Sequence, residues 1–173
     1  MSNLSWLTAR PIAHRGFHDL NKLRWENTLS AFAAAAERGY AIECDVHLTA
    51  DGVPVVIHDA TLERTGLRPD RVADLTSGQL SKIDIGSWFT KKFPKKANPD
   101  FANETVPTLP QVLELLKDKK GLIYIELKCG DTDYEPLAKA VCDVIRGSLL
   151  LPQIIVKSFK LAAIPIVRFY LPE

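Results

Sequence analysis

The feature that most constrains the fold of this chain is residues 41–59, in which two short apolar runs flank a turn. The first run holds Glu43 and Asp45, the turn is Asp51-Gly52, and the second run ends at His58. Side chains alternate along a strand, so Glu43 and Asp45 share one face and the apolar residues between them take the other. Neighbouring carboxylates repel each other and lose hydration when buried. We therefore expect a cation beside them, and a hard divalent metal ion is the obvious candidate.

Apolar spacing in the rest of the chain alternates between strand-like and helix-like patterns. Besides residues 41–59, the predicted strands are residues 11–13, 122–128 and 154–159. The predicted helices cover residues 29–36, after a cap at Asn27 or Thr28, residues 109–116, after a capping box at Thr108, and residues 137–145. A strand–helix–strand order favours parallel strands joined by crossovers. The predicted fold class is therefore α/β.

Polar side chains recur where the predicted strands end. These residues are His14, Arg15, Asp45, His58, Glu126 and Lys128. In a closed (β/α)8 barrel the active site lies at the carboxyl ends of the strands, and an open doubly wound sheet gathers ligands at the same end. The chain contains neither familiar glycine-rich phosphate loop, which argues against nucleotide binding.

Three carboxylates in this set suit a metal ion. Glu43, Asp45 and Glu126 offer only oxygen atoms, a ligand set that Mg²⁺ or Ca²⁺ prefers and zinc does not. The alternative is that Glu43 and Glu126 form ion pairs with Lys128 or Arg15 across neighbouring strands. Both arrangements are compatible with each other.

The remaining polar residues suit phosphoryl chemistry. His14 and His58 form a natural proton-transfer pair, because imidazole gains or loses a proton near pH 7. Arg15 and Lys128 can neutralise the negative charge that develops in phosphoryl transfer. We expect His18 and His47 to lie at the surface.

Composition excludes several classes of partner. The chain has 173 residues, of which 46% are hydrophobic, enough for one domain with a core. Its net charge of +1 gives no electrostatic case for nucleic acid or an anionic membrane surface. No apolar run reaches the ~20 residues of a membrane span, and the first ten residues lack the pattern of a signal peptide. Three dispersed cysteines predict reduced thiols and a cytoplasmic protein.

Several separate motifs, in order, resemble the glycerophosphodiester phosphodiesterase family. They are Ile12-Ala13-His14-Arg15-Gly16, Glu26-Asn27-Thr28-Leu29, Ile42-Glu43-Cys44-Asp45-Val46, Val55-Val56-Ile57-His58-Asp59, Leu62-x-Arg64-Thr65, Pro107-Thr108-Leu109, Ile125-Glu126-Leu127-Lys128 and Lys157-Ser158-Phe159. The resemblance covers about residues 11 to 159. Because the motifs are many and correctly ordered, it is highly specific.

This resemblance implies a (β/α)8 barrel that hydrolyses glycerophosphodiesters to an alcohol and glycerol 3-phosphate with a divalent cation, Mg²⁺ or Ca²⁺. It implies that Glu43, Asp45 and Glu126 bind the metal and that His14 and His58 are the acid–base pair. Arg15 and Lys128 would bind the phosphate, with Glu26 supporting them. Residues 1–173 would form a single, partial domain with about the first five βα units and a small insertion at about 60–106.

The chain departs from the family pattern in two places. Trp25 stands where the family usually has proline, and the resemblance fades after Phe159. The apolar tail, residues 162–171, lacks a clear helical period. Two alternatives therefore stay open. One is a shortened, non-catalytic chain that keeps the metal and phosphate site, and the other is a phosphodiester lyase on the same barrel, which would release a cyclic phosphate. The head group and the oligomeric state are left unassigned.

Overall fold

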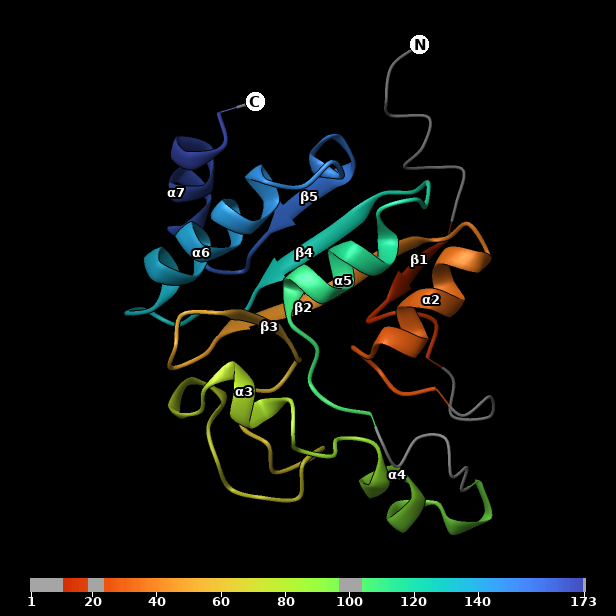
Figure 1. The fold of residues 1–173 in the computed structure, drawn as a ribbon. Helices are drawn as coiled ribbons and strands as arrows, with labels where there is room; N and C mark the ends of the chain where they lie inside the picture. Colours follow the sequence, from red (N-terminus) through yellow and green to blue (C-terminus); the bar gives the residue numbers. More distant parts are fainter. Residues whose placement is uncertain (1–10, 19–23, 97–103, 173) are drawn as a thin grey trace.

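The computed structural model describes residues 11–18, 24–96 and 104–172, and the described part contains one mixed sheet. Its strands are β1 (Ile12–His14), β2 (Ala41–Leu48), β3 (Pro54–Val56), β4 (Ile123–Leu127) and β5 (Ile154–Lys157). The strands β1, β2, β4 and β5 are neighbours in that order and run parallel, while β3 pairs with β2 (Figure 1). The first ten residues, where no signal peptide was expected, lie outside the described residues.

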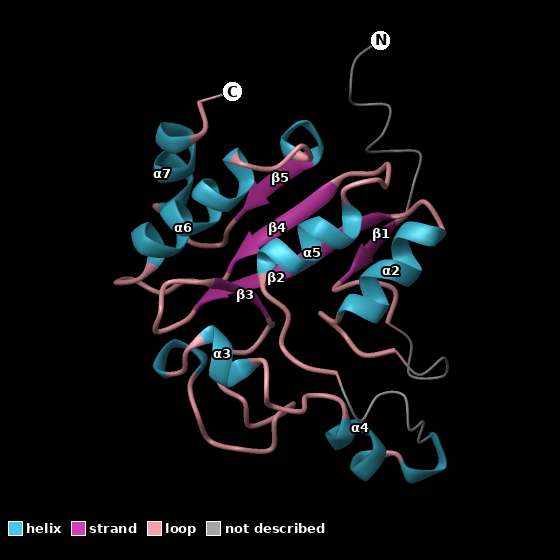
Figure 2. Ribbon diagram, in the orientation of Figure 1, coloured by secondary structure: helices cyan, strands magenta, loops and turns pink. Residues whose placement is uncertain are grey.

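Four longer helices accompany the parallel strands. They are α2 (Leu29–Glu37), α5 (Leu109–Leu116), α6 (Tyr134–Arg146) and α7 (Ala163–Tyr170). Thr28 caps α2, because its hydroxyl accepts a hydrogen bond from the Ala31 amide, and Thr108 forms the predicted capping box with Gln111 at the start of α5. The helix α5 crosses over β2 and β4, with α2 beside β1 and α6 beside β5 (Figure 2).

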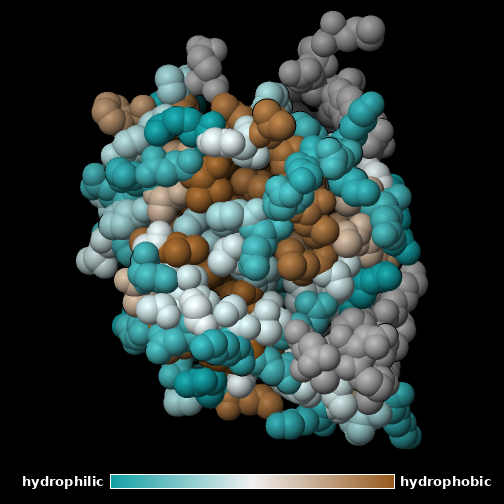
Figure 3. Space-filling model, viewed as in Figure 1, coloured by the Kyte–Doolittle hydropathy of each residue, from teal (hydrophilic) through white to brown (hydrophobic). Residues whose placement is uncertain are grey.

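The main core lies between these helices and one face of the sheet. Ile42, Cys44 and Val46 of β2 point into it with Ile123, Ile125 and Leu127 of β4, and all six are buried. Phe32 of α2 and Leu116 of α5 cover them from the helical side. Hydrophobic side chains still reach the surface in patches on this side of the molecule (Figure 3). The alternate residues of β2 and β4 therefore face the opposite side of the sheet, as in the inner face of a barrel.

The strand β3 is the exception to the parallel arrangement that a strand–helix–strand order favours. It follows β2 with no helix between them, and it pairs antiparallel with β2, with Val46 opposite Val56. The reason is the Asp51-Gly52 turn: Gly52 has φ of +74°, and a link this short can join only antiparallel strands. The described residues hold four parallel strands of the barrel type, and the expected count of about five includes this hairpin arm.

The carboxyl-terminal helix corrects one expectation. Residues 162–171 were expected to lack a helical period, yet α7 forms and packs against the core. Ala163, Ile166 and Val167 supply the inward-facing positions at helical spacing. The pattern is hidden in the sequence because outward residues are apolar too, including Phe169, which is 80% exposed.

The segment predicted as an insertion, residues 60–106, holds two smaller apolar clusters in its described part. One contains Leu62, Leu80 and Ile85, and the other joins Trp25 to Trp88 with ring centroids 4.1 Å apart. Its short elements are η1 (Val72–Asp74), α3 (Ser77–Leu80), α4 (Ser87–Lys92) and η2 (Pro94–Lys96), and η4 (Leu151–Gln153) precedes β5. Residues 97–103 lie outside the described residues. The assignment of a single domain with this insertion stays a prediction.

The carboxylate in the β2–β3 turn gives a prediction about pH. Hydrogen bonds from the Thr49 hydroxyl and from the Ser77 amide and hydroxyl lower the pKa of Asp51 to about 2. Because this folded-state pKa lies below the ordinary 3.8, the stabilisation is fully present above pH 3.8 and is lost as the pH falls through about 2. Urea unfolding should therefore give the wild type a higher free energy of unfolding than Asp51→Asn at neutral pH. The difference between the two proteins should shrink as the pH falls from 3.8 to about 2. A difference that does not change with pH would contradict the lowered pKa of Asp51.

Candidate active site

The register of the sheet brings the acidic residues of β2 and β4 together. Asp45 of β2 lies opposite Glu126 of β4, and Glu43 lies opposite His14 of β1. On its other side Glu126 lies opposite Lys157 of β5. All of these residues belong to the sheet face that the helices do not cover, near the carboxyl ends of the strands. The alternation predicted for Glu43 and Asp45 is thus confirmed.

The three carboxylates form one buried cluster. Glu43, Asp45 and Glu126 are 3%, 1% and 4% exposed, and ligand oxygens from all three lie within 4.8 Å of one another. Charges this close and this buried are costly unless cations compensate them.

Cationic side chains surround the cluster. Lys128 contacts both Asp45, with its Nζ 3.2 Å from Oδ1, and Glu126. Lys157 bridges Glu43 and Glu126 with Nζ–O distances of 2.9 and 2.7 Å. The ion pairs that were open as an alternative to a metal are therefore present in the site, and Lys157 is a partner that the sequence prediction of the site did not include.

The local charges keep Asp45 and Glu126 ionised. Burial favours the neutral form of Asp45, but hydrogen bonds from Asn27 and Lys128 and the positive charge of Lys128 outweigh it and lower the pKa. Burial likewise opposes ionisation of Glu126, whose pKa falls because Lys128 and Lys157 contact it. Burial alone would lower the pKa values of both lysines, yet their carboxylate partners raise them. At neutral pH Asp45 and Glu126 are therefore ionised, and Lys128 and Lys157 are protonated.

The carboxylates fit a hard divalent cation by a separate observation. One oxygen of each residue, Glu43 Oε1, Asp45 Oδ1 and Glu126 Oε1, is buried and is contacted by a lysine ammonium without a hydrogen bond of regular geometry. Buried polar atoms normally have well-aligned hydrogen-bond partners, so three such oxygens on converging side chains leave acceptor capacity for a cation. An all-oxygen set of this kind suits Mg²⁺ or Ca²⁺.

The turn after β1 positions His14 and Arg15. The Arg15 main-chain N–H donates to Glu43 Oε2 at 3.0 Å, and His14 Nε2 lies 3.9 Å from the same oxygen. The Arg15 guanidinium contacts Asp45 through Nε at 3.2 Å and Glu26 through Nη1 at 3.2 Å. Asn27, predicted only as a possible helix cap, donates from Nδ2 to Asp45 Oδ2 at 3.0 Å. These bonds tie the turn to the carboxylate cluster.

The second histidine reaches the site from the hairpin arm. His58 Nδ1 lies 2.6 Å from Asp59 Oδ1. His58 also lines a hollow of about 660 Å³ together with Glu126, Lys128 and Phe159. His47, expected at the surface, is half-buried and its Nε2 lies 3.0 Å from the His58 carbonyl oxygen. The hollow is large enough for a small phosphodiester.

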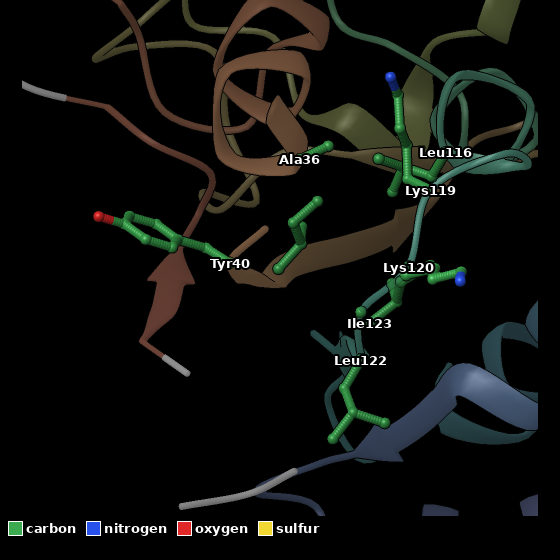
Figure 4. Close-up of a pocket in the computed structure, with 9 residues that line it drawn as sticks. Ala36, Tyr40, Leu116, Lys119, Lys120, Leu122 and Ile123 are labelled. Atoms are coloured by element: carbon green, nitrogen blue, oxygen red, sulfur yellow. The ribbon is translucent and has the colours of Figure 1, made fainter. Parts of the chain in front are cut away.

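A second hollow lies at the opposite, amino-terminal end of the strands. It is lined mainly by apolar side chains such as Leu122 and Ile123, with about 10 Å³ of open volume. The polar tips of Tyr40, Lys119 and Lys120 point in different directions there (Figure 4). None of the described residues that line this hollow is acidic, so the converging polar groups are those at the carboxyl ends of the strands.

Comparison with known proteins agrees with the predicted family. Residues 14–173 match the model of the glycerophosphoryl diester phosphodiesterase family. The chain belongs to this family. It is 40% identical over 149 residues to a glycerophosphodiester phosphodiesterase from Caldanaerobacter subterraneus, covering 86% of this chain and 57% of that protein. A Bacillus subtilis glycerophosphodiester phosphodiesterase is 34% identical over 154 residues, covering 86% of this chain and 51% of that protein.

Solved structures of the family show the same architecture. An Oleispira antarctica phosphodiesterase, in complex with the product sn-glycerol-3-phosphate, superposes with a TM-score of 0.81 at 28% identity, covering 95% of this chain and 63% of that one. A glycerophosphodiester phosphodiesterase from Agrobacterium tumefaciens superposes with a TM-score of 0.75 at 33% identity, covering 95% of this chain and 64% of that one. The expected fold class, part of a (β/α)8 barrel, is confirmed. The chain spans about half the length of these two curated relatives. In the described parts, no helix is both long and apolar enough to cross a bilayer.

Proposed function

We propose that this chain hydrolyses glycerophosphodiesters to an alcohol and glycerol 3-phosphate with the help of a divalent cation. The observation that carries the proposal is the buried triad of Glu43, Asp45 and Glu126, in which one oxygen of each side chain is contacted by a lysine without a hydrogen bond of regular geometry. Family membership and a neighbour described in complex with sn-glycerol-3-phosphate support the substrate class.

The proposed roles follow from charge and position. The three carboxylates would hold Mg²⁺ or Ca²⁺, which when bound supplies positive charge to a phosphate oxygen. Arg15 and Lys128 would bind the remaining phosphate oxygens, because both cations border the cluster and are only 19% and 22% exposed. Glu26 would act indirectly by holding Arg15, since a carboxylate repels phosphate.

His14 and His58 would transfer the protons. One imidazole removes a proton from the attacking water as its oxygen bonds to phosphorus. The other protonates the alkoxide as the bond from phosphorus to the leaving oxygen breaks. His14, beside Glu43, ends β1, and His58, in the hollow, follows β3, so the two imidazoles come from different parts of the sheet, as two groups acting on two different oxygens require.

Metal removal tests the proposal directly. Treatment with a chelator should abolish release of glycerol 3-phosphate from glycerophosphocholine, and Mg²⁺ or Ca²⁺ should restore it, which an enzymatic assay for glycerol 3-phosphate measures. Turnover that is indifferent to the chelator would refute the metal role. A cyclic phosphate product would identify a lyase, and metal binding without turnover would identify a non-catalytic chain.

We also propose a cytoplasmic location. The support is chemical: Cys44, Cys129 and Cys142 are all free thiols, the state that a reducing compartment maintains.

A further inference from the structure

The motif Leu62-x-Arg64-Thr65 has no place in the chemistry described so far, yet Arg64 reaches the site. Its Nε donates to Asp59 Oδ2 at 2.6 Å, and its Nη2 donates to Glu26 Oε1 at 2.6 Å. Arg64 belongs to the segment predicted as an insertion, whereas Glu26 precedes α2 and Asp59 follows β3. One guanidinium therefore joins the residues that follow β3 to the segment before α2, 38 positions away in the sequence.

The two carboxylates that Arg64 bridges each hold another residue of the site. Asp59 accepts from His58 Nδ1 at 2.6 Å, and Glu26 accepts from Arg15 Nη1 at 3.2 Å. The result is a continuous chain of alternating hydrogen-bond donors and acceptors, in the order Arg15, Glu26, Arg64, Asp59 and His58. It links the turn after β1 to the end of the hairpin arm.

We propose that Arg64 is a positioning residue, which fixes the ring of His58 through Asp59 and the guanidinium of Arg15 through Glu26. The effect of Arg64 on catalysis rests on the proposed function, whereas its contacts with Asp59 and Glu26 do not depend on that function. A carboxylate can only accept a hydrogen bond, so the ionised Asp59 requires the proton of neutral His58 to be on Nδ1. The lone pair of Nε2 is then the group that can exchange a proton with the substrate.

Arg64 is suited to this role in a way that lysine is not. Its planar guanidinium donates to two carboxylates at once in fixed directions, whereas an ammonium is a point charge. Burial opposes ionisation of Asp59, but the bonds from Arg64 and His58 lower its pKa and keep it an acceptor. Glu26 is 8% exposed, so loss of Arg64 leaves this buried carboxylate with one cation fewer to compensate its charge.

The experiment compares Arg64→Gln and Arg64→Lys with a matched control, Arg68→Gln. Arg68 lies four positions further along the same segment and also pairs with an aspartate, Asp70, but that pair is exposed and does not reach the site. The two readouts are kcat for glycerophosphocholine hydrolysis and the ¹⁵N NMR signals of the His58 ring, assigned by their loss in His58→Gln. Circular dichroism confirms that each variant is folded.

We expect Arg64→Gln to lower kcat by about 10–100-fold, the usual effect of losing an outer partner of an active-site group. The His58 ring should shift from the Nδ1–H tautomer towards a mixture, Arg64→Lys should fall between Arg64→Gln and wild type, and Arg68→Gln should match wild type in both readouts. The inference is overturned if Arg64→Gln behaves like Arg68→Gln, or if kcat falls while the His58 signals stay unchanged.

Two further outcomes remain informative. If Arg64→Gln does not fold, Arg64→Lys decides, because the inference requires a lower kcat together with an altered His58 ring. If the wild-type chain shows no turnover, the proposed function fails, while the ring signals still test whether Arg64 positions His58.

Discussion

Replacing Asp45 by asparagine is expected to reduce kcat by about 10²–10³-fold or more, the scale of loss when one preorganised electrostatic group leaves an active site. Asparagine has the same shape but no charge. It would leave Arg15 Nε and Lys128 Nζ, each 3.2 Å from an Asp45 oxygen, without an anionic partner at that position. It would also replace one carboxylate oxygen of the proposed metal site with a weaker ligand.

Two measurements separate this effect from misfolding. Calorimetric titration of the substrate-free protein with Mg²⁺ should show weaker binding by Asp45→Asn, and thermal unfolding should show that the variant is folded. The control is Asp143→Asn, the same chemical change on the exposed side of α6, where Asp143 pairs with Lys139. Wild-type turnover by Asp45→Asn would contradict the assignment of this carboxylate.

The second large effect is expected at Gly16, which follows His14 and Arg15. Gly16 has φ of +84°, and a Cβ there would lie 2.8 Å from the Ala31 Cβ and 3.0 Å from the Ala31 carbonyl carbon. Gly16→Ala therefore combines left-handed strain of about 1–2 kcal/mol with overpacking of about 1–3 kcal/mol. The chain must move away from α2, and the turn that carries His14 and Arg15 must move with it. We expect loss of stability in urea unfolding and loss of turnover.

Gly52 provides the matched control. Its φ is +74°, but an added Cβ would meet nothing within 4 Å. Gly52→Ala should therefore cost only the conformational part, about 1–2 kcal/mol, and keep its activity. Equal losses of stability in the two variants would show that the contact with Ala31 is unimportant.

The elements that local chemistry specifies could be predicted from the sequence. The hydroxyls of Thr28 and Thr108 begin their helices because each satisfies a backbone N–H that has no partner within its own helix. Glu43 and Asp45 point to the same face of β2 because side chains alternate along a strand with a period of two residues. These features depend on a few neighbouring residues, which is why the prediction and the structure agree.

Features that depend on distant partners could not be predicted in the same way. The position of Lys157 over Glu43 and Glu126 requires the order of the strands, because β5 pairs with β4 although helix α6 separates them in the sequence. The bridge made by Arg64 requires the path of a long irregular segment, which no periodicity describes. For Lys157 the sequence did offer a signal, because a lysine lies in the predicted strand of residues 154–159. For the bridge made by Arg64 the only signal was the motif Leu62-x-Arg64-Thr65.

The conformation of Arg15 has a consequence for how this protein would respond to selection or design. Arg15 has φ of +57°, a region that costs a residue with a Cβ about 1–2 kcal/mol and costs glycine almost nothing. The left-handed backbone lets its N–H reach Glu43 while its guanidinium reaches Asp45 and Glu26. Glycine at position 15 would relieve this strain, but it would leave the buried carboxylates of Asp45 and Glu26 with one cation fewer, a loss of about 3–5 kcal/mol when one partner of a buried ion pair is removed. Selection for stability and selection for turnover therefore both favour arginine at this position, although its backbone is strained.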